Sequence, residues 1–384
     1  MLDRALKGGK GYWSWIVFLL FVIGVGFVTF LYQDRMGPIV TGLSRDVSWG
    51  LYIGQYAYFV GIAAGAVMVI MPLYLHNYKA FARISVLADF LGVAAIIMVG
   101  LFVFVDLGKV TRILNIAIFG QPKSILFWNM IILNGYMILC LLIGWNVLSA
   151  ERKGLPHPKW VTFLIYLSIP WAFSIHTSTA FVFAGLPGRH FWLSAIMAPR
   201  FLSSAFCSGP AFLFITCMIM KKVSSFDPGD EQMKTLGGII AYAFIINTFF
   251  FMVELFTAFY SSIPQAMDPF IYLFTGLHGH GGFVPWMWTY VFFTICALIL
   301  LIIPSTRRNL ETLTVACGAV LISTWIDKGL SMVPGGFIPD PFGKVFEYSP
   351  TAIEIIITIG IYAAGFFVIT VLFKTAISIK KEIA

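Results

Sequence analysis

The chain has 384 residues, of which 59% are hydrophobic, 17% are aromatic and only 11% are charged, whereas about a quarter of the residues of a soluble domain are charged. With a mean hydropathy of +0.90, this composition excludes a soluble globular protein and leaves no room for a sizeable water-exposed domain. The formal net charge of +8 comes from 25 Lys and Arg against 17 Asp and Glu. In so apolar a chain we expect this excess to mark one side of a membrane rather than a nucleic acid partner.

Ten apolar runs are long enough to cross a bilayer, because a transmembrane helix needs about 20 apolar residues. We expect helices at residues 13–32, 49–75, 84–105, 126–149, 160–184, 191–220, 236–260, 284–304, 310–327 and 351–373. The basic start of the chain resembles that of a signal peptide, but the following run is too long and lacks a small-residue cleavage site. The sequence therefore predicts an all-α integral membrane protein whose first helix stays as an anchor.

Basic residues are unequally divided between the two sides of this ten-helix arrangement. Both termini and the loops on their side hold 16 Lys and Arg, against 8 in the opposite loops. By the positive-inside rule, both termini face the cytoplasm and the chain spans the cytoplasmic membrane. The longer opposite loops, at 33–48, 106–125, 185–190, 261–283 and 329–350, then face outward.

A possible internal repeat links the second and sixth spans. Trp49 opens the one and Trp192 the other, and small residues follow at the same two offsets, namely Gly61 and Gly65, and Ser204 and Ser208. Small residues four apart let helices approach closely. We predict parallel four-helix bundles at 49–185 and 186–330, an N-terminal anchor and outer loop at 1–48, and an outer loop with a C-terminal helix at 331–384. A chance similarity between two apolar helices is the alternative.

Cysteine and histidine give no sign of a metal centre. The five cysteines lie in apolar runs without the close spacing of an iron–sulfur or zinc site, so we interpret them as small buried hydrophobic residues. His176 is the one histidine well inside a span, whereas a membrane haem b needs paired axial histidines. We expect no haem, iron–sulfur cluster or metal in this chain.

Ionisable groups within or beside the bilayer are the most informative residues, because such groups are costly there and face a cavity or a partner. In the outer half they are Asp106, Arg112, His176, Arg200, Glu254, Asp327 with Lys328, and Glu354, and in the inner half there is Asp89. This one-sided distribution favours chemistry at the outer leaflet over a channel lined on both halves.

Each of these groups also has a structural interpretation. Arg200 and Glu254 lie at comparable depth and form either a charge pair that locks two helices or part of a proton path. The same two alternatives apply to Asp89, Asp327 and Glu354, and Asp327 with Lys328 could simply end the ninth span outside. His176 is either a structural histidine or the group that exchanges a proton with a quinone oxygen, with Asp106 as relay and Arg112 tuning the local field.

Short motifs in a fixed order resemble those of the NrfD-like membrane subunits of the polysulfide reductase type, nearest the ten-helix branch with DsrP and HmcC. They are Ser48-Trp49-Gly50, Val105-Asp106-Leu107-Gly108-Lys109 with Arg112, Pro170-Trp171 with Ser174, His176 and Thr177, Pro199-Arg200-Phe201, Pro334-Gly335-Gly336, and Glu347-Tyr348-Ser349-Pro350-Thr351 with Glu354. The resemblance covers most of the chain.

The resemblance implies two four-helix bundles plus two peripheral helices and a menaquinone or other quinone pocket near the outer face. It assigns His176, Asp106, Arg112 and Trp49 to that pocket. It also implies an outward-facing ferredoxin-like iron–sulfur subunit, a multihaem cytochrome c and further membrane and cytoplasmic redox subunits as partners, in a respiratory complex of sulfur metabolism. The alternatives are a proton or ion conduit of such a complex and a solute transporter built from repeats.

Overall fold

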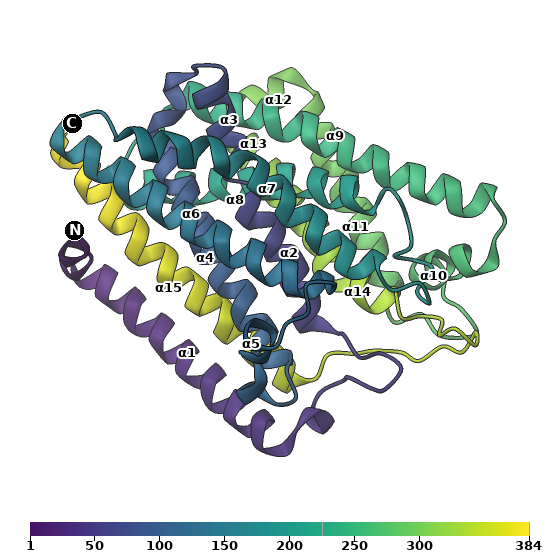
Figure 1. Cartoon of the computed structure of the whole chain (residues 1–384). Coiled ribbons are helices and arrows are strands. Elements are labelled where there is room, and N and C mark those ends of the chain that lie inside the picture. Colours follow the sequence, from purple (N-terminus) through teal and green to yellow (C-terminus); the bar gives the residue numbers. More distant parts are fainter. Residues whose placement is uncertain (225, 384) are drawn as a thin grey trace.

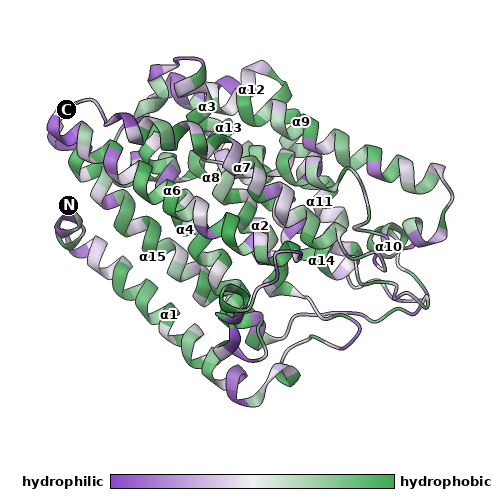
Figure 2. Cartoon of the chain, in the orientation of Figure 1, coloured by the Kyte–Doolittle hydropathy of each residue, from purple (hydrophilic) through white to green (hydrophobic). Residues whose placement is uncertain are grey.

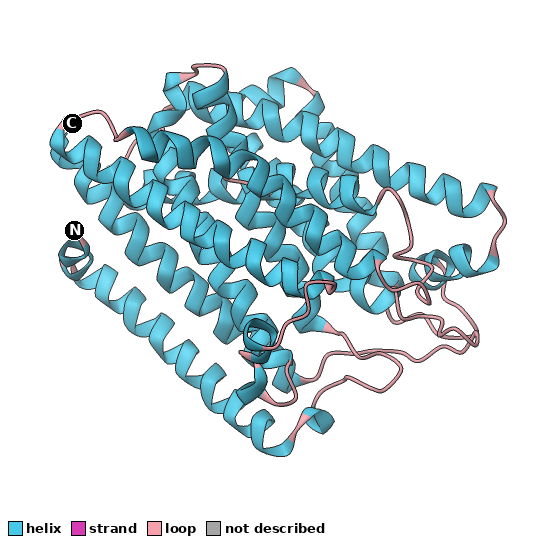
Figure 3. Ribbon diagram, viewed as in Figure 1, coloured by secondary structure: helices cyan, strands magenta, loops and turns pink. Residues whose placement is uncertain are grey.

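The computed structural model describes residues 1–224 and 226–383. Within these ranges the elements are helices joined by loops, and no strand is present (Figure 3). Ten helical segments in the described part of the chain are long and apolar enough to cross a membrane. This confirms the predicted all-α membrane protein with ten spans.

Seven spans each contain one long helix. They are α1 (Lys10–Met36), α4 (Ala82–Asp106), α6 (Ile125–Lys153), α7 (Lys159–Ala184), α8 (Met197–Val223), α9 (Asp230–Tyr260) and α11 (Val284–Ile302). The tenth span lies in α15 (Ala352–Ile383), and the second consists of α2 (Leu51–Ala64) and α3 (Val67–Leu75). The ninth span joins α13 (Leu310–Thr324), the π-helical η5 (Trp325–Ser331) and α14 (Met332–Gly335).

Short helices connect the spans. They are η1 (Leu2–Leu6), η2 (Pro38–Val40), η3 (Lys79–Phe81), η4 (Val110–Arg112), α5 (Asn115–Ile118), α10 (Pro264–Phe274) and α12 (Pro304–Arg308). Figure 2 shows apolar residues along the long helices and polar residues mainly toward their ends. Large apolar side chains such as Phe21 and Val28 on α1 are more than half exposed, because the bilayer is an apolar solvent for this surface.

Eight of the spanning helices group into two sets through their contacts. The first helix set comprises α2 with α3, α4, α6 and α7, and the second helix set comprises α8, α9, α11 and α13 with η5. α1 and α15 lie side by side outside them, with α15 against α4 (Figure 1). Both termini lie at one end of the helices, and the long loops gather at the other, here called the loop end (Figure 1). A symmetry axis relating the two sets, and the limits of the four predicted domains, remain predictions.

The two helix sets meet where α2 crosses α8. A Cβ atom on Gly65 would lie 2.7 Å from the carbonyl carbon of Gly209, and one on Gly61 would lie 3.5 Å from the Ser208 Oγ. At the loop end of the same seam, the rings of Trp49 and Trp192 stack with centroids 6.0 Å apart. The residues that suggested a repeat thus include residues that pack against one another.

The prediction that the ninth span ends at Asp327 is wrong. Helical structure continues through η5 and α14 to Gly335, and both Asp327 and Lys328 are buried inside it. Two adjacent charges normally indicate a helix end, but here they are retained inside because Arg200 supplies a counter-charge. The predicted domain boundary after residue 330 therefore falls within this span, and Lys328 no longer belongs to an outer loop.

We expect Gly65→Ala to destabilise the protein by about 1–3 kcal/mol, because the new methyl group would overpack the α2–α8 contact. Gly318→Ala on α13 is the matched control, since a Cβ atom there would meet nothing within 4 Å and alanine favours helix. Thermal unfolding in detergent measures both. Equal midpoints for the two variants would contradict the close-packed seam.

Candidate functional site

A buried ionic cluster occupies the second helix set near the loop end. Arg200 of α8 is 1% exposed, and its guanidinium donates to the carboxylate of Glu254 on α9 and, at 2.7 Å, to Asp327 Oδ1 on η5. The Arg200 Cζ also lies 5.0 Å from the ring centroid of Phe251. The sequence predicted the contact with Glu254, and the structure adds Asp327.

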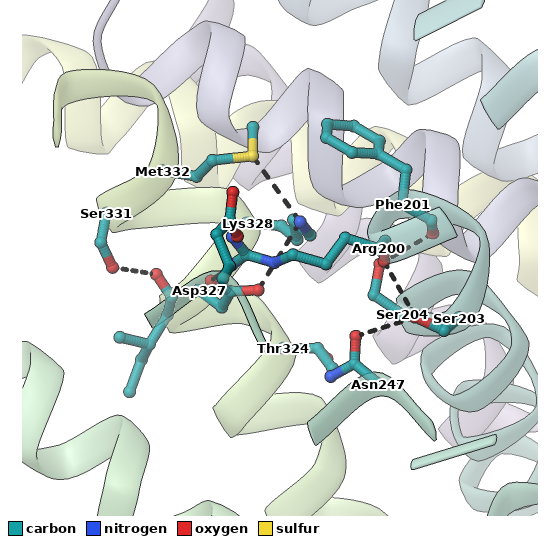
Figure 4. Close-up of polar contacts among 12 residues, drawn as sticks. Arg200, Phe201, Ser203, Ser204, Asn247, Thr324, Asp327, Lys328, Ser331 and Met332 are labelled. Atoms are coloured by element: carbon teal, nitrogen blue, oxygen red, sulfur yellow. Dashed lines mark hydrogen bonds and ion pairs between the residues drawn. The ribbon is translucent and has the colours of Figure 1, made fainter. Parts of the chain in front are cut away.

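Lys328 completes the cluster from the same turn of η5 (Figure 4). Its Nζ lies 3.7 Å from Asp327 Oδ2 and 4.5 Å from the ring centroid of Phe201. Two cations and two anions therefore occupy one buried region, so their formal charges cancel. A neutral cluster is the form in which ionisable side chains are least costly within a membrane.

The π-helical turn η5 is held against α2 by polar and backbone contacts. Gln55 Nε2 donates to the Gly329 carbonyl at 2.7 Å, and a Cβ atom on Gly54 would lie 2.9 Å from the Gly329 carbonyl carbon. A π turn displaces carbonyls from the regular α-helical ladder, and such turns are frequent at functional sites. The side chain of Gln55 satisfies one of these carbonyls.

His176 lies within the first helix set. Its side chain is fully buried in α7, and neither ring nitrogen has a hydrogen-bond partner among the described residues. A short polar chain connects the same helix to its neighbours: Tyr56 Oη donates to Asn129 Oδ1 at 2.5 Å, and Asn129 Nδ2 donates to Ser178 Oγ at 3.1 Å and Thr179 Oγ1 at 2.9 Å. This polar chain joins α2, α6 and α7.

A groove of about 320 Å³ runs between α6 and α7 at the loop end. Its walls include Trp128 and Phe173, and three hydroxyl side chains, Ser174, Thr177 and Ser178, line it. The hydroxyl groups of Ser174 and Thr177 each donate to the carbonyl four residues earlier, so their lone pairs remain available to a ligand. Ser178 links the groove to Asn129 and Tyr56.

Asp106 ends α4 beside a narrow cavity of about 10 Å³, which Gln33 and Tyr52 also line. Its Oδ1 has no hydrogen-bond partner in the described part of the chain. Tyr52 donates to Gln33 Oε1 at 2.7 Å, and Gln33 Nε2 donates to the Val105 carbonyl at 2.8 Å. This cavity has about the volume that one water molecule occupies, so it is too small for a quinone ring.

The four predicted quinone residues do not share a cavity. Trp49 lines an outer pocket of about 360 Å³ with Arg189 and Phe337, Arg112 is exposed on η4, and His176 lines neither this pocket nor the cavity beside Asp106. Burial lowers the pKa of Arg189. The structure thus places the four residues around the loop end of the molecule rather than in one site.

Asp89 and Glu354 have different surroundings. Asp89 is 2% exposed on α4, with an Oδ1 that has no partner among the residues described. Glu354 accepts hydrogen bonds from the backbone N–H groups of Gly42 and Thr351 and from Tyr348 Oη, at 2.7, 2.9 and 2.6 Å. Burial and the nearby Glu354 charge raise the pKa of Tyr348. These contacts favour a structural role for Glu354, which ties two outer loops to α15.

Metal-binding geometry is not found in the described residues, where no three His, Cys, Asp or Glu side chains are grouped closely enough to hold an ion. The five cysteines are free, and four of them are buried.

Several residues of these sites were missed in the sequence. Asp327 was assigned to a helix end, and its contact with Arg200 joins positions 127 residues apart. Tyr56, Asn129, Ser178 and Gln55 are uncharged, so a search for ionisable groups passed over them. Ser174 and Thr177 were noted as motif residues, without a role in a site.

Comparisons with known proteins agree on one family. The family model described as "Polysulphide reductase, NrfD" matches residues 39–338. The Hdr-like menaquinol oxidoreductase integral membrane subunit of Archaeoglobus fulgidus is 24% identical over 94% of this chain and 92% of its own length. A selenate reductase subunit of Mesobacillus selenatarsenatis is 26% identical, over 88% and 87%. A protein of Halobacterium salinarum, provisionally named as a membrane subunit of dimethyl sulfoxide reductase, is 26% identical over 94% and 89%.

We expect Arg200→Ala to destabilise the protein by about 3–5 kcal/mol, because it leaves buried carboxylates without their counter-charge. Arg200→Ala combined with Glu254→Gln should recover part of that loss, since the two changes together restore a neutral cluster. Lys234→Ala, which breaks an exposed pair with Glu231, is the control and should cost less than about 1 kcal/mol. A double variant as unstable as the sum of its single variants, measured by thermal unfolding, would show that the pair is not coupled.

Proposed function

This chain belongs to the NrfD family of polysulphide reductase membrane proteins, and we propose that it is the quinone-interacting membrane subunit of a multi-subunit redox complex. The names of its relatives support an oxidoreductase complex, and one of them is a menaquinol oxidoreductase subunit. In this proposal the chain is a component of an enzyme rather than a complete enzyme. Menaquinone is the expected quinone.

The groove between α6 and α7 is the observation that carries the proposal. Ligand sites of this kind measure about 300–1,000 Å³ and combine mostly apolar walls with a few polar groups, and the groove has about 320 Å³ with aromatic walls and three hydroxyl groups. Because Ser174 and Thr177 are exposed and lie within a membrane span, a lipophilic molecule can reach them from the bilayer.

The residues around the groove can orient a ligand and conduct its protons. A bound quinol supplies two electrons and two protons. Ser174 and Thr177 can accept hydrogen bonds from its hydroxyl groups, because their own protons point to backbone carbonyls. Ser178, Asn129 and Tyr56 form hydrogen bonds leading away from the groove, along which a proton can move if the hydroxyl groups rotate.

We retain His176 and Asp106 as proton-handling residues in this proposal. His176 follows Ser174 and precedes Thr177 on α7, and its unbonded nitrogens leave it free to exchange a proton. Asp106 has an unbonded oxygen at the loop end of α4, where it can pass protons to the adjacent water. Arg112, which is exposed, can act only through the field near that outlet, and Trp49 is a candidate for the outer pocket.

The loop end is the proposed docking face for a redox partner. Glu347 Oε1 accepts from the Gly282 backbone N–H at 2.9 Å, and this hydrogen bond lowers the pKa of Glu347. Together with Glu354, it orders the two longest loops into a continuous surface. We propose that an outward-facing iron–sulfur subunit, with a multihaem cytochrome c and further subunits, exchanges electrons there, that both termini lie in the cytoplasm, and that the complex serves sulfur metabolism.

We predict that His176→Ala and Asp106→Asn each reduce quinol-linked electron transfer by about 10²–10⁴-fold, the range typical of lost acid–base catalysis. Steady-state turnover of the assembled complex with a soluble quinol measures this, and subunit stoichiometry checks assembly. His190→Ala in an exposed outer loop is the control. Unchanged turnover in both variants would remove these residues from the site.

A second prediction concerns the groove itself. Thr177→Trp fills it and should prevent quinol turnover without loss of assembly, because the indole would occupy the space between α6 and α7. Leu141→Trp on the exposed face of α6 is the matched control. Normal turnover in the Thr177 variant would place the quinone elsewhere. Substrate uptake by reconstituted protein without quinone would instead favour a transporter, and proton flux without quinone would favour a conduit.

A further inference from the structure

A second apolar cavity lies at the seam between the two helix sets, on the side that α15 covers. It has a volume of about 240 Å³, and its lining includes Tyr58 of α2, Met98 of α4, Leu321 of α13 and Tyr362 of α15. It shares no lining residue with the groove between α6 and α7. The proposed quinone site therefore does not account for it.

The cavity has a buried end and an open end. At the buried end Tyr58 and Met98 are 6% and 2% exposed, whereas at the mouth Ile322 and Phe366 are 41% and 40% exposed. All four residues belong to membrane-spanning segments. A molecule that enters this cavity must therefore come from the hydrocarbon layer of the bilayer.

The polar groups at the wall are already engaged with one another. The single N–H of the Trp325 indole donates to Gln55 Oε1 at 2.8 Å and to Tyr362 Oη at 3.0 Å, and Tyr362 Oη donates to the same Gln55 oxygen. Gln55 Nε2 donates to the Gly329 carbonyl. The cavity thus offers an occupant apolar and aromatic surface, whereas a quinone ring needs donors for its oxygens.

We propose that this cavity binds one acyl chain of a bilayer phospholipid. An apolar cavity of about 150 Å³ is known to hold a benzene molecule, so 240 Å³ is enough for a segment of a hydrocarbon chain. The chain packs against Trp325, which is two residues from Asp327 and shares η5 with it. The lipid therefore supports the turn that carries Asp327 and Lys328 into the ionic cluster.

The test uses the complete chain in nanodiscs of phosphatidylethanolamine and phosphatidylglycerol that contain a phospholipid with a photoreactive diazirine in its acyl chain. After irradiation, mass spectrometry locates the labelled residues. We expect labelling at Met98, Phe366 and Trp325 above that on the exposed face of α1, and its loss in Leu321→Trp, which fills the cavity. Val315→Trp, also on α13 but 64% exposed, should keep the labelling.

Ile322→Trp at the mouth provides a second variant, because its added volume extends toward the bilayer and does not depend on overpacking the interior. Circular dichroism identifies the variants that fold. Labelling no higher than on α1, or labelling that persists when either folded variant is used, would overturn the proposal. Stronger labelling by a quinone with a photoreactive isoprenoid tail, in equimolar competition, would overturn it too, because the occupant would then be a quinone tail.

Discussion

The close contact between α2 and α8 is the constraint on which the rest of the structure depends. Glycine at positions 65 and 209 lets the two backbones touch, and α2 thereby lies between the first helix set and η5. The same helix carries Tyr56 toward α6 and α7 and Gln55 toward η5. One tightly packed helix thus positions both the polar chain of the first set and the π-helical turn of the second.

Charge neutrality explains why the second set can hold four ionisable side chains within a membrane span. Arg200 is bound by two carboxylates from different helices, and Lys328 lies beside one of them. Such a cluster links α8, α9 and η5, and breaking it would leave an unpaired charge. The first set contains a different kind of interior, with isolated polar groups on Asp89 and His176 and a chain of uncharged hydrogen bonds. Proton exchange with a ligand fits the first set better, since its polar groups are not engaged in ion pairs.

Hydrophobic runs predicted the ten spans, because long apolar segments have few other stable structures in a membrane. Buried charge also predicted the contact of Arg200 with Glu254. The end of the ninth span was wrong because Asp327 and Lys328 look like helix-terminating residues until their distant partner is known. The site could be predicted only in part: His176, Asp106, Arg112 and Trp49 share the loop end without sharing a cavity, and the groove depends on how α6 and α7 pack, which no local pattern encodes.

The central claim is that a quinone binds between α6 and α7. Cryo-electron microscopy of the native complex with a tight-binding quinone analogue tests it most directly. The account predicts ring density between Trp128 and Phe173, within hydrogen-bond distance of Ser174 or Thr177. Ring density in the outer pocket beside Trp49, in the cavity beneath α15, or in another subunit would contradict it.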